Sequence, residues 1–192
     1  MPKSALVSLL ALAAACAAWE ARAEPDITGM WYVDQAATPR VPAALTPEAA
    51  AEDKADAAQR AKTGRLMTEA HIKCWPTGMP QMMVQPFGLE ILQTKGRITV
   101  LNEVSTLPRT IYMDRATHPE GLQPSWNGHS VGKWEGDVLV IDTVGLNGRH
   151  QRSSTALHIT ERISLADGGK TLYDEITQED PNVYAKPYTV KY

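Results

Sequence analysis

The sequence predicts a mainly β protein, an antiparallel β-barrel of eight to nine strands with one helical insertion near its N-terminus. Three observations lead to this prediction. Short runs rich in β-branched and aromatic residues recur along the chain, Gly and Pro clusters separate them, and one Ala-rich run interrupts them early. Many strands joined by short turns favour a barrel over a layered α/β fold, and a β-sandwich is the main rival.

Residues 1–23 have the pattern of a cleaved secretory signal peptide. Lys3 precedes an apolar run from Ala5 to Ala18, and Ala21-Arg22-Ala23 supplies the small residues of a cleavage site. The run has about fourteen residues, fewer than the roughly twenty that cross a bilayer as a helix. We therefore expect residues 24–192 to form a single β-barrel domain that is periplasmic or secreted.

Both cysteines bear on this expectation. Cys16 lies inside the apolar run, so its lipidation is an alternative to simple cleavage and would tether the protein to a membrane. Cleavage after Ala23 instead leaves Cys74 as the one cysteine of the mature chain, which excludes an internal disulfide. The fold is then expected to depend on its core alone.

The charge of the mature chain argues against nucleic acid as a partner. Without Lys3, Glu20 and Arg22 the chain has 17 basic and 21 acidic residues, a net charge of −4, and no basic cluster. Proteins that bind nucleic acid carry a basic patch or stripe. The partner that we expect is a small, largely apolar molecule.

The first strand is predicted over Asp26–Val33, where β-branched and aromatic residues surround Gly29. A helix is then expected to begin at Pro47, with Thr46 as its N-cap, and to continue to about Lys62. Its acidic residues come early and its basic residues late, as the helix dipole favours. Because its apolar face is mostly alanine, this helix should pack only shallowly against the domain.

The segment from Cys74 to Pro86 contains three prolines and one glycine, which exclude regular structure and indicate an ordered loop or flap. The chain beyond it is predicted to be continuously β. Lys95-Gly96 is a two-residue turn between the first two of the later strands. These strands are expected at residues 87–94, 97–103, 109–114, 128–134, 138–144, 155–165, 171–178 and 186–192.

On the first strand, Gly29-Met30-Trp31 resembles the Gly-x-Trp motif of lipocalins and related calycins. In those barrels the tryptophan closes the floor and often packs under an arginine from a late strand. The resemblance implies a lipocalin-like barrel, with Arg162 as the candidate for that arginine. The sequence departs from the lipocalin pattern in placing a long helix between the first and second strands.

The hairpin within His118–Leu146 concentrates reactive side chains. Alternation along its second strand places Asp142 on the same face as Val138 and Val140. A carboxylate among apolar side chains is either paired and hydrogen-bonded or has a raised pKa that suits acid–base catalysis. The alternative is an aspartate at a strand end that bonds the following loop.

The preceding strand carries His129 between two glycines, Gly128 and Gly132, which would let backbone or a ligand approach closely. Ser130 lies two residues from each glycine, so this segment is not the Gly-x-Ser-x-Gly elbow of serine hydrolases. That elbow also requires a helix next, whereas residues 133–137 form a hairpin turn. A serine hydrolase is therefore not predicted.

The strand over residues 155–165 places His158 on one face and Glu161 among aliphatic side chains on the other. A buried glutamate must be neutral or matched by a cation, and Arg109, Arg162 or a histidine are the candidates. The alternative is an edge strand that leaves Glu161 in water.

Five histidines, at positions 71, 118, 129, 150 and 158, raise the question of a metal site. No His-x-His or His-x-x-x-His pair is present, so zinc is not predicted. Cys74 with Met79, Met82 and Met83 offers sulfur ligands that would suit cuprous copper. The favoured interpretation is that these methionines fill gaps between the loop and the barrel, and no metal site is predicted.

Four side chains are candidates for binding the substrate, because aromatic and histidine rings could line a pocket for a flat apolar ligand: Tyr112, His118, Trp126 and Trp134. Ordinary core packing explains the aromatic residues equally well.

The segment Trp126–Thr143 carries the motif W-x-G-H-S-x-G-x-W-E-G-D, with Cys74–Pro80 upstream and Leu157–Arg162 downstream. In these segments the chain resembles a family of secreted bacterial single-domain proteins. The resemblance implies one domain and the relevance of these residues, but no particular reaction.

Two hypotheses of function follow. In the first, the protein is an enzyme of lyase, isomerase or cyclase type that needs no cofactor, with His129 or His158 as base and Asp142 or Glu161 as acid or orienting group. It requires His129, Asp142 and at least one of His158 and Glu161 to face a common cavity. In the second, the protein is a non-catalytic carrier whose polar groups only orient a ligand.

Overall fold

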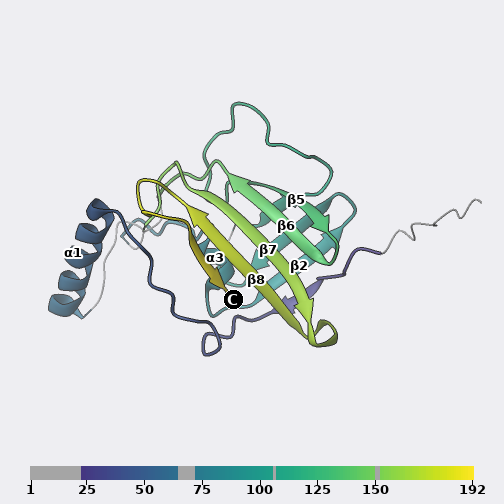
Figure 1. The fold of residues 1–192 in the computed structure, drawn as a ribbon, viewed down its shortest axis with the longest axis horizontal. Helices are drawn as coiled ribbons and strands as arrows, with labels where there is room; N and C mark the ends of the chain where they lie inside the picture. Colours follow the sequence, from purple (N-terminus) through teal and green to yellow (C-terminus); the bar gives the residue numbers. More distant parts are fainter. Residues whose placement is uncertain (1–22, 65–71, 106, 150–151) are drawn as a thin grey trace, which may run out of the picture.

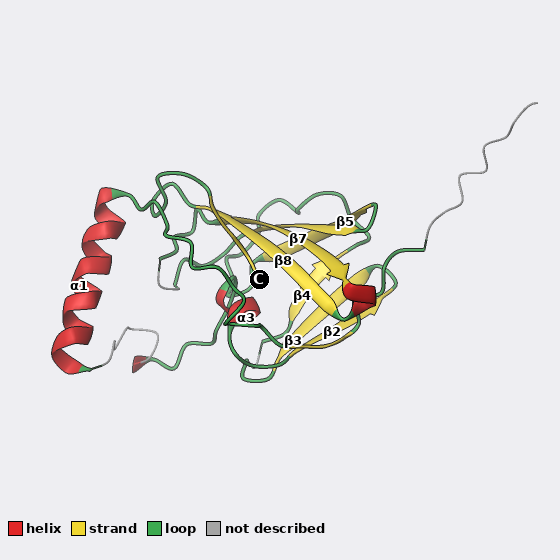
Figure 2. Ribbon diagram, turned by 60° about the horizontal axis from the view of Figure 1, so that its bottom comes forward, coloured by secondary structure: helices red, strands yellow, loops and turns green. Residues whose placement is uncertain are grey.

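Nine strands form one curled sheet in a computed structural model that describes residues 23–64, 72–105, 107–149 and 152–192. The strands follow one another across the sheet in chain order, from β1 at one edge to β9 at the other. The sheet curls into a half-barrel (Figures 1 and 2). The predicted mainly β, barrel-like fold is therefore confirmed.

Each predicted strand is present, with ends that differ by three residues or fewer from those predicted. The strands are β1 (Gly29–Trp31), β2 (Leu89–Thr94), β3 (Arg97–Asn102), β4 (Arg109–Tyr112), β5 (His129–Glu135), β6 (Val138–Val144), β7 (His158–Ala166), β8 (Thr171–Glu179) and β9 (Tyr188–Lys191). The helices are α1 (Pro47–Thr63) and the single turn α3 (Gln81–Val84), and a short 3-10 turn, η1 (Asp167–Gly169), joins β7 to β8.

The sheet departs from an antiparallel one at a single pair. β4 and β5 are parallel, with Ile111 opposite Ser130, while the other seven neighbouring pairs are antiparallel. Parallel neighbours need a long connection because the chain must return to the end from which it started. Residues 113–128 make this connection, which we call the β4–β5 loop (Figure 1).

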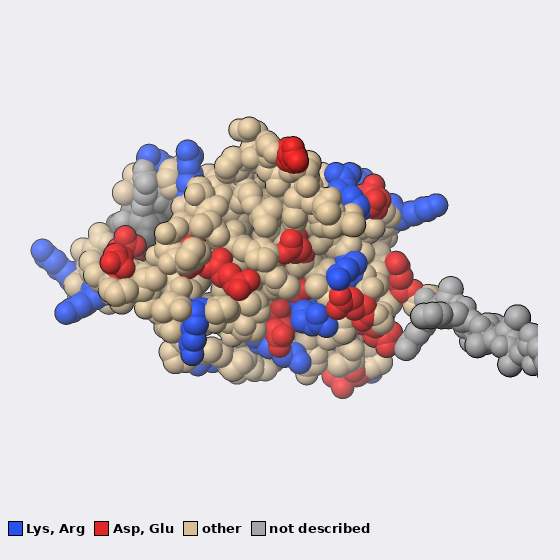
Figure 3. All heavy atoms as spheres, turned by 45° about the horizontal axis from the view of Figure 1, so that its top comes forward, with Lys and Arg blue, Asp and Glu red and all other residues tan. Residues whose placement is uncertain are grey.

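The predictions for the N-terminus fall outside the described residues. These are the signal peptide, of which residues 1–22 are not described, and the lipidation of Cys16. Within the described ranges, no helix combines the length and hydropathy needed to span a bilayer. Figure 3 shows acidic and basic side chains interspersed over one face of the molecule, without a continuous basic patch.

The helix α1 matches its prediction. The Thr46 hydroxyl accepts a hydrogen bond from the Ala49 amide at 3.2 Å, and Gly64 ends the helix in the left-handed conformation. Of its residues only Ala49 is buried, and the helix stands to one side of the sheet (Figure 1). It therefore contributes little to the core, as its alanine-rich face predicts.

The inner face of the sheet is filled by aliphatic side chains from β2 to β9 and by the segment that precedes β2. Met79 and Met82 are fully buried in this core and Met83 nearly so, whereas Cys74 is exposed. The structure thus supports the interpretation of these methionines as filler over that of a shared sulfur site. The space that would hold a ligand in a lipocalin is occupied here by side chains.

A buried ion pair crosses the inner face. Arg109 and Glu161 are both fully buried, and the guanidinium binds both carboxylate oxygens, with Arg109 Nη1 at 2.8 Å from Glu161 Oε1. Ser130 and Thr143 provide the other partners of the guanidinium, at 3.2–3.3 Å. Of the alternatives for Glu161, the structure confirms burial with Arg109 as the matching cation.

The expected lipocalin contact between Trp31 and Arg162 is wrong. Arg162 is exposed on the outer face of the sheet, where it bonds Glu135 at 3.4 Å. Trp31 packs against the core and donates its indole N–H to the Ile27 carbonyl at 3.0 Å. The cause is alternation, because Arg162 follows the inward-facing Glu161 and must therefore point outward.

Substitution of Glu161 should destabilise the fold strongly. Glu161→Ala leaves the Arg109 guanidinium buried without its carboxylate, and loss of one partner of a buried pair costs about 3–5 kcal/mol. The free energy of unfolding in urea measures this loss. Replacement of both partners, Arg109→Met with Glu161→Leu, should recover most of it, and a loss under about 1 kcal/mol for Glu161→Ala would contradict the assignment.

Asp174 is a third charged residue of this core. It is buried on β8, and burial raises the pKa of its carboxyl well above 3.8, with the charge of Glu161 raising it further and that of Arg109 opposing. The folded state therefore holds a proton on Asp174 that the unfolded chain releases above pH 3.8. The stability of the fold decreases as the pH rises above this value.

Asp174→Asn should remove this pH dependence. The amide has the shape of the carboxylic acid and cannot ionise, so the variant should gain stability over the wild type as the pH rises from about 5 to about 8. Urea unfolding of both proteins at the two pH values measures the difference. Equal changes in the two proteins would show that Asp174 does not hold the proton.

Candidate functional site

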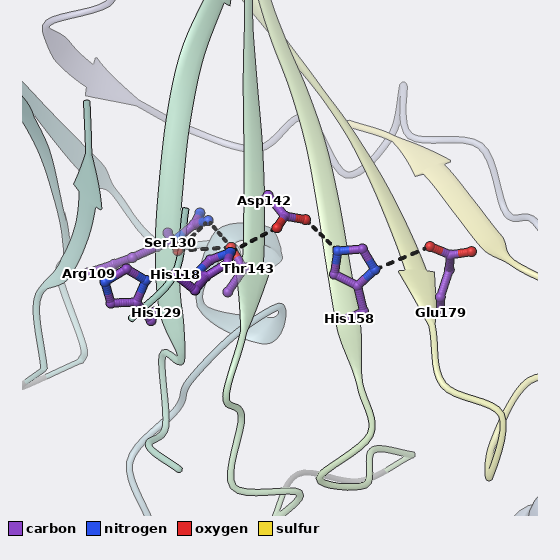
Figure 4. Close-up of polar contacts among 8 residues, drawn as sticks. All are labelled: Arg109, His118, His129, Ser130, Asp142, Thr143, His158 and Glu179. Atoms are coloured by element: carbon purple, nitrogen blue, oxygen red, sulfur yellow. Dashed lines mark hydrogen bonds and ion pairs between the residues drawn. The ribbon is translucent and has the colours of Figure 1, made fainter. Parts of the chain in front are cut away.

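Polar side chains from β5, β6, β7 and β8 meet on the outer face of the sheet, joined by one residue of the β4–β5 loop (Figure 4). Alternation on β6 buries Leu139, Ile141 and Thr143 in the core and turns Asp142 outward. On β7 it buries Ile159 and turns His158 outward. The site therefore lies on the outer face and not in the interior of the barrel.

Five residues form a continuous polar chain, which we call the histidine chain: His129, His118, Asp142, His158 and Glu179. His129 Nδ1 lies 2.7 Å from His118 Nδ1, and His118 Nε2 lies 2.8 Å from Asp142 Oδ2. The other oxygen of Asp142 bonds His158 Nε2, and His158 Nδ1 lies 3.3 Å from Glu179 Oε2. The Asp142 carboxylate thus binds two imidazoles.

Strand register brings these residues together. His158 lies directly opposite Glu179, and Asp142 lies opposite Thr160, so Asp142 is a diagonal neighbour of His158 on the same face. His129 lies opposite Val144 at the same end of the sheet. The β4–β5 loop then places His118 between His129 and Asp142.

Gly128 sets the start of β5 and so the position of His129. It has a φ of +64°, and a Cβ at this position would lie 2.5 Å from the Val144 carbonyl oxygen. A side chain would therefore force β5 away from β6. The close approach expected at this glycine is confirmed, and at Gly132 the close neighbours are the side chains of Met113 and Ile111.

The site is partly exposed to solvent. The side chains of Asp142 and His158 are 46% and 38% exposed, and that of His118 is 18% exposed. Ion pairs at such exposure contribute little to stability because water screens them. A set of five polar residues held in one order at this exposure is therefore not explained by stability alone.

Asp142 is ionised at neutral pH. Burial alone would raise the pKa of its carboxyl, but hydrogen bonds from His158 and His118, with the charges of both rings, outweigh burial and hold the pKa below 3.8. An ionised carboxylate only accepts hydrogen bonds. His118 and His158 must therefore both donate through their Nε2–H groups.

The surroundings of His129 oppose its protonation. Burial lowers the pKa of its imidazole below 6.5, and the charges of His118 and Arg115 lower it further. The ring stacks on Tyr112 with centroids 4.9 Å apart, and the Arg115 guanidinium lies 4.0 Å from the Tyr112 centroid. His129 is thus unprotonated at one nitrogen at neutral pH.

The order of the hydrogen bonds identifies that nitrogen. A neutral His118 that donates from Nε2 has only a lone pair at Nδ1, so the hydrogen of the 2.7 Å contact belongs to His129 Nδ1. The lone pair of His129 is then at Nε2, which has no partner among the described residues. In this order of hydrogen bonds, the basic nitrogen of His129 is Nε2.

The structure brings five of the predicted site residues together. The candidates are linked in the order His129, His118, Asp142, His158, and Tyr112 stacks on His129. His129, Asp142 and His158 share one face of the sheet, which is the outer one. The catalytic hypothesis required a common cavity, and that part of it stays a prediction.

Three predicted site residues lie elsewhere. Glu161 is on the inner face with Arg109, so it is not the acid or orienting group of this site. Trp134 packs against the core, and Trp126 pairs with Trp75, with ring centroids 5.6 Å apart. For Trp134 alternation is again the reason, because this residue faces inward with Ser130 and away from His129.

Two residues of the site were not predicted. Glu179 ends β8 opposite His158, and the pairing of β7 with β8 is the signal that would have found it. Arg115 lies on the β4–β5 loop beside Tyr112. No pattern in the sequence connects Arg115 to His129, because the contact depends on the path of the loop.

Comparison with models of protein families, with curated proteins and with solved structures finds no match to this chain.

Asp142→Asn should disturb the tautomers of the histidine chain. An amide accepts through one oxygen and donates through its nitrogen, so it cannot accept from both His118 and His158. In long-range ¹H–¹⁵N spectra at about pH 8, the wild type should show both rings as Nε2–H tautomers, and the variant should lose this preference in at least one. Unchanged tautomers in both rings would contradict the shared carboxylate.

Proposed function

We propose that this protein is a secreted enzyme that transfers protons on a small, largely apolar molecule, by lyase or isomerase chemistry that needs no cofactor. His129 is the general base. The observation that carries the proposal is the histidine chain, which leaves the Nε2 lone pair of His129 free at neutral pH.

The proton transfer follows from the order of the chain. His129 Nε2 takes a proton from the substrate, so a substrate X–H bond breaks, an N–H bond forms, and the bonding pair stays on the substrate. The His129 imidazolium then donates from Nδ1 to His118, which is held by the Asp142 carboxylate. Return of the proton to another atom completes an isomerisation, and its return to a leaving group completes an elimination.

Asp142 and His118 are positioning residues in this scheme. The negative charge of Asp142 reaches His129 through His118, so it stabilises the imidazolium that forms during the reaction. Both tautomers are fixed before substrate arrives, so neither ring needs to reorient. This is the role that a carboxylate performs for a histidine in catalytic triads.

His158 is not the base in this proposal. Its Nε2–H donates to Asp142, and its Nδ1 lies 3.3 Å from a Glu179 carboxylate oxygen, so neither nitrogen faces a substrate. An imidazole in this position holds Asp142 in place from the side opposite His118. Of the two bases that the sequence allows, the geometry favours His129.

The side chains packed on the inner face of the sheet favour an enzyme over a carrier. A lipocalin-like carrier needs a cavity inside the barrel, whereas here aliphatic and methionine side chains pack the inner face. The polar groups instead converge on the outer face. The Tyr112 ring stacks on His129 and helps to hold its imidazole in place.

The test uses deuterium uptake and needs no known substrate. The protein is incubated in D₂O with the small molecules extracted from a bacterial culture, and mass spectrometry follows deuterium at carbon and new products. We expect wild-type protein to label or convert at least one compound and His129→Ala to reduce its rate by about 10²-fold or more, the usual contribution of a general base. Equal labelling by the two proteins would contradict the proposal.

Two further variants sharpen this test. Asp142→Asn should lower the same rate, since it removes the charge that stabilises the His129 imidazolium. Arg162→Gln is the matched control, because Arg162 is an exposed polar residue of the same face that bonds Glu135 and not the histidine chain. A rate that falls equally in all three variants would indicate general damage to the fold.

A further inference from the structure

The contact between His118 and His129 also determines how the β4–β5 loop is attached to the sheet. We propose that this contact is a pH-sensitive latch: at acid pH both imidazoles become protonated, their shared hydrogen bond is lost, and the loop separates from the outer face of the sheet. The inference does not depend on a catalytic role for His129.

His118 is the main attachment of the middle of this loop. Within residues 114–124 every residue is exposed except His118 and Leu122. Leu122 packs near Gly145, and His118 makes the two polar contacts described above. The ends of the loop are fixed separately, by hydrogen bonds from the Met113 amide to Gly96 and from the Ser125 amide to Gly145, each 2.9 Å long.

The hydrogen bond between His118 and His129 can persist when the pair gains one proton but not when it gains two. With His118 and His129 both neutral, one Nδ1 donates to the other across 2.7 Å. If one ring becomes charged, it can still donate to the lone pair of its neighbour. If both are charged, both Nδ1 atoms carry hydrogens and two cations face each other, so the attraction becomes repulsion.

The surrounding charges decide which ring is protonated first. Asp142 on β6 faces His118, and Asp142 in turn contacts His158 on β7, which contacts Glu179 on β8. His129 on β5 faces the ring of Tyr112 on β4, which the Arg115 guanidinium also contacts. These surroundings oppose a charge on His129, so protonation of His129 is the step that opens the latch.

The sign of the pH effect follows. With the loop attached, burial and the charges of His118 and Arg115 hold the pKa of His129 below 6.5. When the loop is released, His118 moves away and the pKa of His129 returns toward 6.5. The released state thus binds the additional proton more tightly, and attachment, complete above pH 6.5, weakens as the pH falls below it.

Limited proteolysis tests the latch on the full chain, because cleavage within residues 114–124 requires the loop to leave the sheet. A non-specific protease is used at about pH 7.5 and about pH 4.5, a range in which Asp142 stays ionised, and each cleavage rate is normalised to that of the same segment as a free peptide. We expect the protection of the loop from cleavage to fall by about tenfold or more at the lower pH, while β6 to β8 stay protected. Equal loop protection at the two pH values would overturn the proposal.

Two variants identify the titrating ring. In His129→Asn the amide provides a hydrogen-bonding group near the position of Nδ1 and cannot be protonated, so the loop should keep its protection at low pH. His158→Asn removes the other histidine that contacts Asp142 and should leave the pH dependence unchanged. Loss of protection in His129→Asn as in the wild type, or loss of the pH dependence in His158→Asn, would place the switch elsewhere.

A third variant tests the attachment itself. His118→Ala removes both polar contacts of the loop and should leave residues 114–124 poorly protected at either pH. Wild-type protection of β6 to β8 from cleavage would show that the fold is intact. If the loop of His118→Ala remained as protected as in the wild type, His118 would not be its attachment and the latch would not exist.

Discussion

The Asp142 carboxylate accepts hydrogen bonds from two imidazoles, and the arrangement of the whole site depends on this shared acceptor. One oxygen fixes His118 on the loop and the other fixes His158 on β7. The tautomer of His118 in turn decides which nitrogen of His129 holds the lone pair. The carboxylate has no hydrogen, so its neighbours can only donate to it. A single ionised group thus determines the tautomers of three imidazoles from three separate parts of the chain.

The two faces of the sheet carry charged groups in different surroundings. Inside, Arg109 and Glu161 are fully buried and their hydrogen bonds are all made within the core. Such a pair contributes little net stability but is costly to break, so it holds β4 and β7 in one arrangement. Outside, the histidine chain is partly exposed, where ion pairs are weak and easily reorganised. A rigid inner face therefore supports an outer face whose protonation can change.

The alternation of side chains between the two faces of a strand predicted much of this site. Alternation does not show which face is the inner one or which loops reach it, and this explains what was missed. It placed Asp142 apart from Thr143, and His158 apart from Glu161, as the structure has them. It could not say which face was inner, because Asp142 shares its face with valines and both faces of β6 are largely apolar. The contact of His118 with β5 and β6 depends on the parallel pairing of β4 with β5, which is a long-range property of the sheet that no local pattern encodes.

The attachment of the loop and the basicity of His129 are linked, because both depend on the same two Nδ1 atoms. An interaction that holds His118 against His129 opposes the addition of a second proton to the pair. Conversely, addition of that proton weakens the attachment of the loop. Linkage of this kind is reciprocal, so a ligand that stabilises the attached loop must lower the pKa of His129 further, by the same free energy. Substrate that binds under the loop would therefore keep the proposed base unprotonated. The unusual pairing of two histidines through Nδ1 thus joins access to the site with the protonation state that the proposed chemistry needs.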